Sequence, residues 1–128
     1  MIKFKMVSVI TAVIALTLCL VFLITPEVIF MLFNIDENSS AFFIGRRAAM
    51  LFLGISLITW VGRNASHSDS RQAVCLGLAI SMFSLAVLGT IEYLRGFAGF
   101  GISLAVMTET FLALLYFKIW FSCKNAIQ

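Results

Sequence analysis

Residues 41–61 read AFFIGRRAAMLFLGISLITWV, an apolar run with two adjacent arginines, Arg46 and Arg47, a few residues inside it. A run of about 20 apolar residues is long enough to cross the hydrocarbon core of a membrane as a helix. Charge at that depth is costly, so an arginine inside a span marks a functional or architectural site by default. This run therefore indicates a membrane protein and supplies its first candidate site residues.

Three further apolar runs cover residues 6–24, 73–94 and 102–121. Of the 128 residues, 62% are hydrophobic and 12% are charged, which is too little polar surface for a soluble globule of this size. None of the runs shows the alternation of a membrane β-strand. We expect an all-α, polytopic membrane protein whose four transmembrane helices form a compact up-down bundle, as a single domain over residues 1–128.

The segment after the first span is too short to cross the membrane. Pro26 stands where a new helix can begin, Glu27 follows near its N-terminus, and residues 34–40 are turn formers. The sequence predicts a short helix over residues 26–35. This helix either lies at the outer interface or continues the first span past a kink, and the interfacial position is favoured.

The basic residues near the ends of the spans predict the orientation. One side of the membrane receives Lys3, Lys5, Arg63, Arg71, Lys118 and Lys124, and the other receives Arg46, Arg47 and Arg95. The side richer in Lys and Arg is cytoplasmic by the positive-inside rule. We expect a multi-pass protein of the bacterial cytoplasmic (inner) membrane with both termini in the cytoplasm.

Two stripes of small residues predict helix packing. They are Ala41, Gly45 and Ala49 in the second span, and Ala73, Gly77 and Ser81 in the third. Small side chains at four-residue spacing let two membrane helices approach closely. Packing within the bundle is favoured for both stripes, and an interface between copies or with a larger complex is the alternative.

The candidate site is a polar cluster in the outer third of the membrane, formed by Arg46, Arg47, Glu92, Glu109 and Glu27. Glu109 follows the start of its span by 7 residues, which places it roughly 10 Å deep at about 1.5 Å per residue. Two hypotheses follow: the cluster packs the bundle through paired charges, or it forms a water-accessible pocket that binds an anion. Adjacent arginines point about 100° apart, so at most one faces the bundle interior directly.

Catalytic chemistry finds no support in the sequence. It contains no Ser-His-Asp or Cys-His arrangement, no metal-ligand spacing and no phosphate-binding loop. We therefore expect no enzyme activity, no metal and no cofactor. The net charge of +3 follows the membrane orientation rather than forming a patch, so nucleic-acid binding is not expected.

Several short motifs occur in a characteristic order along the chain. They are Thr25-Pro26-Glu27, Leu32-Phe33-Asn34-Ile35, Arg47 with Gly54, Trp60 with Arg63, and the Ser/Arg loop that reaches Arg71. In this order the chain resembles a family of small, uncharacterised four-span proteins of the bacterial inner membrane. The resemblance implies a compact four-helix bundle and brings no known activity with it.

Two functions from different classes remain open. The first is a non-enzymatic accessory or self-associating subunit, whose partners are membrane lipids and a homo-oligomer or larger membrane complex. The second is a small binding or transport protein for an amphipathic anion, lipid, quinone or proton-coupled solute.

The orientation is testable with a reporter fused after Gln128. Because both termini are expected inside, a reporter that is active only in the cytoplasm should be active, and one that requires export should be silent. Activity of the exported reporter alone would contradict the orientation.

Overall fold

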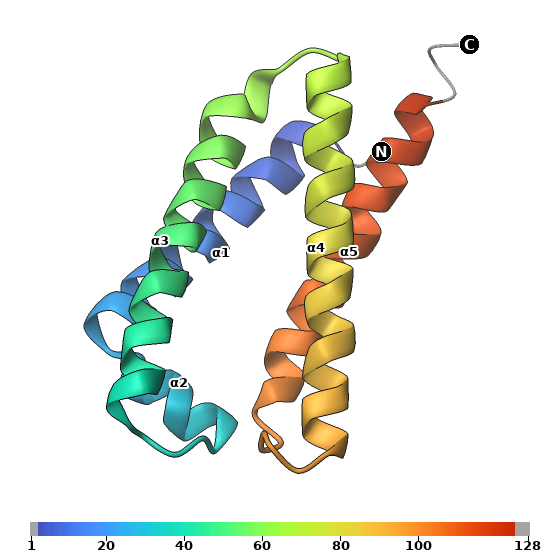
Figure 1. Ribbon diagram of the computed structural model, residues 1–128. Helices are drawn as coiled ribbons and strands as arrows, with labels where there is room; N and C mark the ends of the chain where they lie inside the picture. The colour runs from blue at the N-terminus through green and yellow to red at the C-terminus, as the bar shows by residue number, and fades with distance from the viewer. Residues whose placement is uncertain (1–2, 125–128) are drawn as a thin grey trace.

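Helices account for nearly all of the chain in the computed structural model, which describes residues 3–124. The elements are α1 (Phe4–Ile24), α2 (Pro26–Phe33), α3 (Ser39–Val61), the 3₁₀ turn η1 (Gly62–Asn64), α4 (Asp69–Leu94) and α5 (Ile102–Lys124), shown in Figure 1. α1, α4, α5 and the α3–η1 segment are long and apolar enough to span a membrane. This confirms the expected all-α fold with four membrane-crossing helices in up-down order.

Side-chain caps determine where α3 and α4 begin. Asn38 Oδ1 accepts a hydrogen bond from the amide of Ala41 at 2.8 Å, and Ser68 Oγ accepts one from the amide of Arg71 at 3.2 Å. Such caps satisfy backbone donors that have no partner within the helix. Each helix thus starts before its apolar run, in polar sequence.

α2 turns away from the line of α1 and crosses the end of the bundle (Figure 1). Pro26 occupies its first turn, and Asn34, in the left-handed conformation with φ 54°, ends it after Phe33. The helix is therefore two residues shorter than the predicted segment 26–35. Its Phe30 ring packs edge-on against Phe42 of α3, with 5.1 Å between ring centroids.

α1 and α3 form the first helical hairpin. Gly45 and Ala49 are buried, and a Cβ added at Gly45 would lie 3.4 Å from Cδ1 of Phe22 on α1. Ser56 Oγ donates a hydrogen bond to the carbonyl of Ala12 at 2.9 Å, which joins the same two helices. The first small-residue stripe thus packs against a neighbouring helix, as predicted.

α4 and α5 form the second hairpin, but the predicted stripe of α4 is not the face that packs. Ala73, Gly77 and Ser81 are all exposed. The buried residues of α4 are Cys75, Ala79, Met82, Ala86 and Gly89. This face is displaced from the predicted one by two residues, or about 200° of helix rotation, so that prediction is wrong.

The two hairpins meet mainly where α1 packs against α5. Phe4 and Val7 of α1 lie in one buried cluster with Cys75, Tyr116 and other residues of the second hairpin. The hydroxyl of Tyr116 donates a hydrogen bond to Oγ1 of Thr11 at 2.7 Å. At the α2 end, the amide of Gly99 donates to the carbonyl of Phe33 at 2.6 Å.

The connection between α3 and α4 lies at the same end of the bundle as the two ends of the described chain. Lys3, Arg63 and Cys123 line one pocket there. We call this end the basic end, and the opposite one, which α2 crosses, the α2 end.

The close approach of α4 to α5 is testable at Gly89. A Cβ there would lie 2.9 Å from Cγ2 of Val106, so Gly89→Ala should destabilise the solubilised protein by about 1–3 kcal/mol through overpacking. Gly77→Ala is the matched control, because nothing lies within 4 Å of its added Cβ. Thermal unfolding in mild detergent measures both, and an equal loss in the two variants would contradict the assigned packing face.

Candidate functional site

The predicted outer cluster is not held together by ion pairs. Arg46, Arg47 and Glu27 are exposed, whereas Glu92 and Glu109 are half-buried. Within residues 3–124, none of these five side chains forms an ion pair or a hydrogen bond with another. The expected pairing of an arginine with Glu109 is therefore absent from the described structure.

The rotation of α3 about its own axis explains why neither arginine pairs with Glu109. Its buried face, which carries Gly45 and Ala49, packs on α1, and the two arginines lie off that face. The guanidinium of Arg47 lies 5.8 Å from the ring centroid of Phe43, a residue of the same helix. Glu109 instead lines a cavity between the two hairpins.

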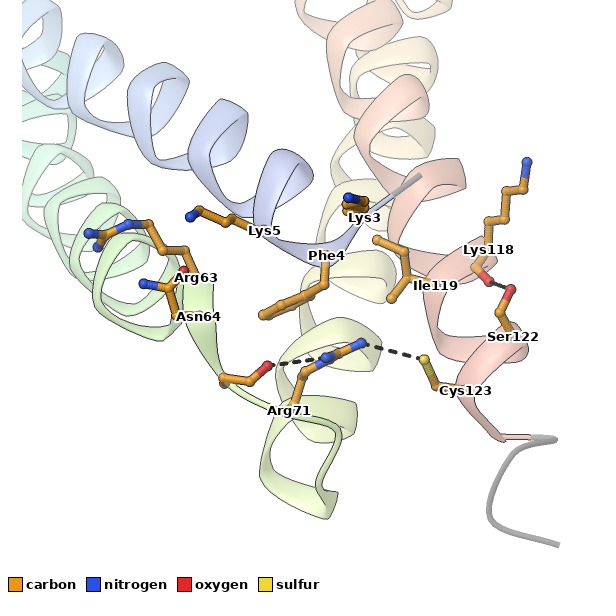
Figure 2. Close-up of a pocket in the computed structure, with 11 residues that line it drawn as sticks. Lys3, Phe4, Lys5, Arg63, Asn64, Arg71, Lys118, Ile119, Ser122 and Cys123 are labelled. Atoms are coloured by element: carbon orange, nitrogen blue, oxygen red, sulfur yellow. Dashed lines mark hydrogen bonds between the residues drawn. The ribbon is translucent and has the colours of Figure 1, made fainter. Parts of the chain in front are cut away.

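A different group of basic residues lies at the basic end, around a pocket of about 580 Å³. Its lining residues, which define the basic pocket, are Lys3, Phe4, Lys5, Arg63, Asn64, Ala65, Arg71, Lys118, Ile119, Ser122 and Cys123. They come from the start of α1, from η1 and the residue after it, from the first turn of α4 and from the end of α5 (Figure 2). Segments far apart in the sequence thus contribute to one site.

Arg71 connects most of these segments. Its guanidinium donates to the carbonyl of Ala65 at 3.1 Å and to Sγ of Cys123 at 3.5 Å, and it lies 4.6 Å from the ring centroid of Phe4. Figure 2 shows it between the loop and α5. Its Nε is buried and has no acceptor among the described residues, and such an unsatisfied donor is unusual in a folded protein.

Arg63 is held at the edge of the pocket by Trp60. Its guanidinium lies 4.2 Å from the ring centroid of Trp60, and its Nη1 donates to the carbonyl of that residue at 2.5 Å. Stacking on an aromatic face together with a backbone acceptor fixes the plane of a guanidinium. The remaining donors of Arg63 have no acceptor in residues 3–124.

The three lysines of the pocket are exposed, and their ammonium groups form no ion pair or hydrogen bond with the described part of the chain. In Figure 2 the side chain of Lys118 extends away from Arg71, which places its ammonium on the rim. Lys3 and Lys5 flank Phe4, whose ring is buried. The pocket thus combines two guanidinium groups that have protein contacts with three exposed lysine ammonium groups that have none.

Among residues 3–123, no carboxylate lines the basic pocket. Five cations around one hollow create a positive potential that attracts an anion, and the low dielectric of the adjoining apolar helices strengthens it. Guanidinium and ammonium donors match phosphate and carboxylate oxygens. The arrangement can therefore hold a multivalent oxyanion.

An apolar groove of about 470 Å³ adjoins the basic pocket. It shares Phe4, Ala65 and Arg71 with the pocket. Leu57, Ile58, Val61 and Val74 form most of its apolar wall. A charged pocket and an apolar groove therefore meet at Arg71.

In the sequence, the cations of this pocket indicate only the orientation of the protein. Four spans place both ends of the described chain and the connection between the second and third spans at the same face of the membrane, and these segments carry the pocket cations. Their convergence depends on the packing of α1 against α5 and on the cap at Ser68 that positions Arg71, and neither produces a recognisable motif.

Comparison of the chain with family models, with curated proteins and with solved structures finds no match.

Arg71 should contribute more to stability than its neighbours in the pocket. Arg71→Lys removes the planar group that contacts Phe4, Ala65 and Cys123, so we expect a loss of about 1–3 kcal/mol. Lys5→Gln is the control, because Lys5 is exposed and has no such contacts. Thermal unfolding in detergent compares them, and similar melting temperatures for both variants would refute the connecting role of Arg71.

Proposed function

We propose that this chain is a non-enzymatic, multi-pass protein of the bacterial cytoplasmic membrane that binds an anionic amphiphile through a phosphate-type head group. The observation that carries the proposal is the basic pocket, whose described lining residues include five cations and no carboxylate. Near a membrane surface each Lys or Arg contributes about 1 kcal/mol to the attraction of an anionic lipid. Arginines already oriented by Trp60, Phe4 and Ala65 add geometric selectivity, because less freedom is lost on binding.

The adjoining apolar groove supports an amphiphile over a free anion. An acyl chain lying along Leu57, Ile58 and Val61 would leave its head group beside Arg71, where groove and pocket meet. Burial of each methylene contributes about 0.8 kcal/mol, which a soluble phosphate ester does not gain. The ligand chemistry common to both sources is a phosphate oxyanion.

The topology proposed here places the basic end in the cytoplasm. The positive-inside distribution of Lys and Arg supports this placement, as does the resemblance to four-span inner-membrane proteins. The cytoplasmic leaflet then supplies anionic lipid directly to the pocket.

Self-association through α3 is a second candidate. α3 belongs to the least buried of the four candidate spans, and Arg46 and Arg47 lie on its exposed side. Charges that face out of a bundle at this depth are stabilised by a partner helix or by head groups. An accessory subunit with its polar residues at such an interface would use this face.

Native mass spectrometry with added lipid tests both candidates. The wild-type protein should retain phosphatidylglycerol in preference to phosphatidylcholine of the same acyl chains. The double variant Lys5→Gln with Arg63→Gln removes two pocket cations and should weaken this retention about thirtyfold, at about 1 kcal/mol per residue. Arg46→Gln with Arg47→Gln is the matched control, because it removes the same charge from residues outside the pocket.

The outcomes separate the alternatives. Equal retention of the two lipids, or equal weakening by the two double variants, would contradict the basic pocket as the site. Glycerol 3-phosphate that binds as tightly as the lipid would identify a soluble anion as the ligand instead. The same spectra count copies, and a dimer that is lost only in the Arg46 and Arg47 variant would favour self-association through α3.

A further inference from the structure

A second cavity, of about 190 Å³, lies between the two helical hairpins. α1 to α5 all contribute to its wall, which shares no residue with the basic pocket. It exists because the hairpins contact each other mainly through α1 and α5, so that the space between them is incompletely filled. The size is comparable to cavities of about 150 Å³ that bind benzene in other proteins.

The wall is apolar except for three side chains: Thr11, Thr108 and Glu109. Leu32, Phe52, Met82 and Leu112 are typical of the rest. No cation lines this cavity. Arg46 and Arg47, which the sequence placed at a similar depth, are exposed on α3 and do not contribute to it.

The hydroxyl groups of Thr11 and Thr108 already donate hydrogen bonds within their own helices. Thr11 Oγ1 donates to the carbonyl of Val7 at 2.9 Å, and Thr108 Oγ1 donates to the carbonyl of Leu104 at 2.9 Å. Thr11 also accepts from the hydroxyl of Tyr116. Both threonines therefore offer the cavity only acceptor lone pairs.

The side chain of Glu109 forms no hydrogen bond or ion pair within residues 3–124, although the residue is half-buried. A carboxylate in apolar surroundings is unfavourable unless a donor or a positive charge accompanies it. When Glu109 is ionised, the cavity presents a negative charge and hydrogen-bond acceptors and no donor. A ligand that complements it must bring both a positive charge and N–H groups on a small apolar body.

We propose that this cavity is a binding site for a small lipophilic ammonium ion, whose N–H groups donate to Glu109 and whose apolar body fills the space between the hairpins. An anion of the same shape is repelled by Glu109. A neutral hydrocarbon fills the space but leaves the carboxylate without a partner. The site is independent of the basic pocket, which has the opposite charge and lies at the basic end.

The test uses three probes of similar shape: benzylammonium, benzyl alcohol and phenylacetate. Isothermal titration calorimetry with the protein in zwitterionic nanodiscs should show the ammonium bound at least tenfold more tightly than the alcohol, and no binding of the carboxylate. Glu109→Gln, which keeps the size of the side chain and removes its charge, should weaken ammonium binding at least tenfold. It should change alcohol binding less than twofold. Glu92→Gln is the matched control, because Glu92 is also half-buried but does not line the cavity.

Equal binding of the ammonium and the alcohol to the wild type would overturn the proposal, and so would unchanged ammonium binding in Glu109→Gln. The comparison of the three probes on the wild-type protein still tests the proposal if Glu109→Gln fails to fold. Ala105→Leu places extra volume in the cavity wall and should reduce ammonium binding without changing any charge. Ammonium binding that persists unchanged in Ala105→Leu would place the ligand elsewhere and contradict the site.

Discussion

The contact between α1 and the second hairpin is the interaction on which the basic pocket and the inter-hairpin cavity both depend. Each hairpin packs closely by itself, through Gly45 and Ala49 in one and through Gly89 in the other. Between them, packing is concentrated near the start of α1, where Tyr116 donates to Thr11 inside an apolar cluster. In a membrane no hydrophobic force drives helices together, so close packing and buried hydrogen bonds must supply the association. Where close packing and buried hydrogen bonds occur, the two hairpins are joined. Where these contacts are lacking, a cavity remains between the hairpins.

This junction also explains why two sites of opposite charge coexist in a small bundle. It brings Phe4 beneath Arg71 and sets the start of α1 beside η1 and α5, which assembles the basic pocket. Farther along α1 the hairpins separate enough to leave the cavity that Glu109 lines. At the α2 end the hydrogen bond from Gly99 to Phe33 joins them again. The apolar region between pocket and cavity keeps the two charges apart, so that neither neutralises the other.

The sequence predicts most of the fold and little of the site. Helix number, order and approximate bounds follow from apolar runs of membrane-spanning length and from the turn formers between them, because a chain in lipid must satisfy its backbone within helices. The short helix after Pro26 was recognisable from its proline and its length. The packing face of α4 was not, since its buried residues include Cys75 and Met82 and only part of the face is small. The basic pocket was not recognisable either, because basic residues gather at one face of nearly every membrane protein and only tertiary packing decides whether they converge.

The direction of Arg47 relative to the Gly45 stripe was, by contrast, within reach of the sequence. Gly45 and Ala49 indicate which face of α3 packs, and that interpretation agrees with the structure. At about 100° per residue, Arg46 lies about 100° from Gly45 and Arg47 about 200° from it. Arg47 must therefore point away from α1 whenever Gly45 points toward it. The stripe and the arginine pair were treated as separate features, although one helix cannot turn both toward the same neighbour. The exposed guanidinium groups then depend on head groups or another chain, and Glu109 on whatever occupies the cavity.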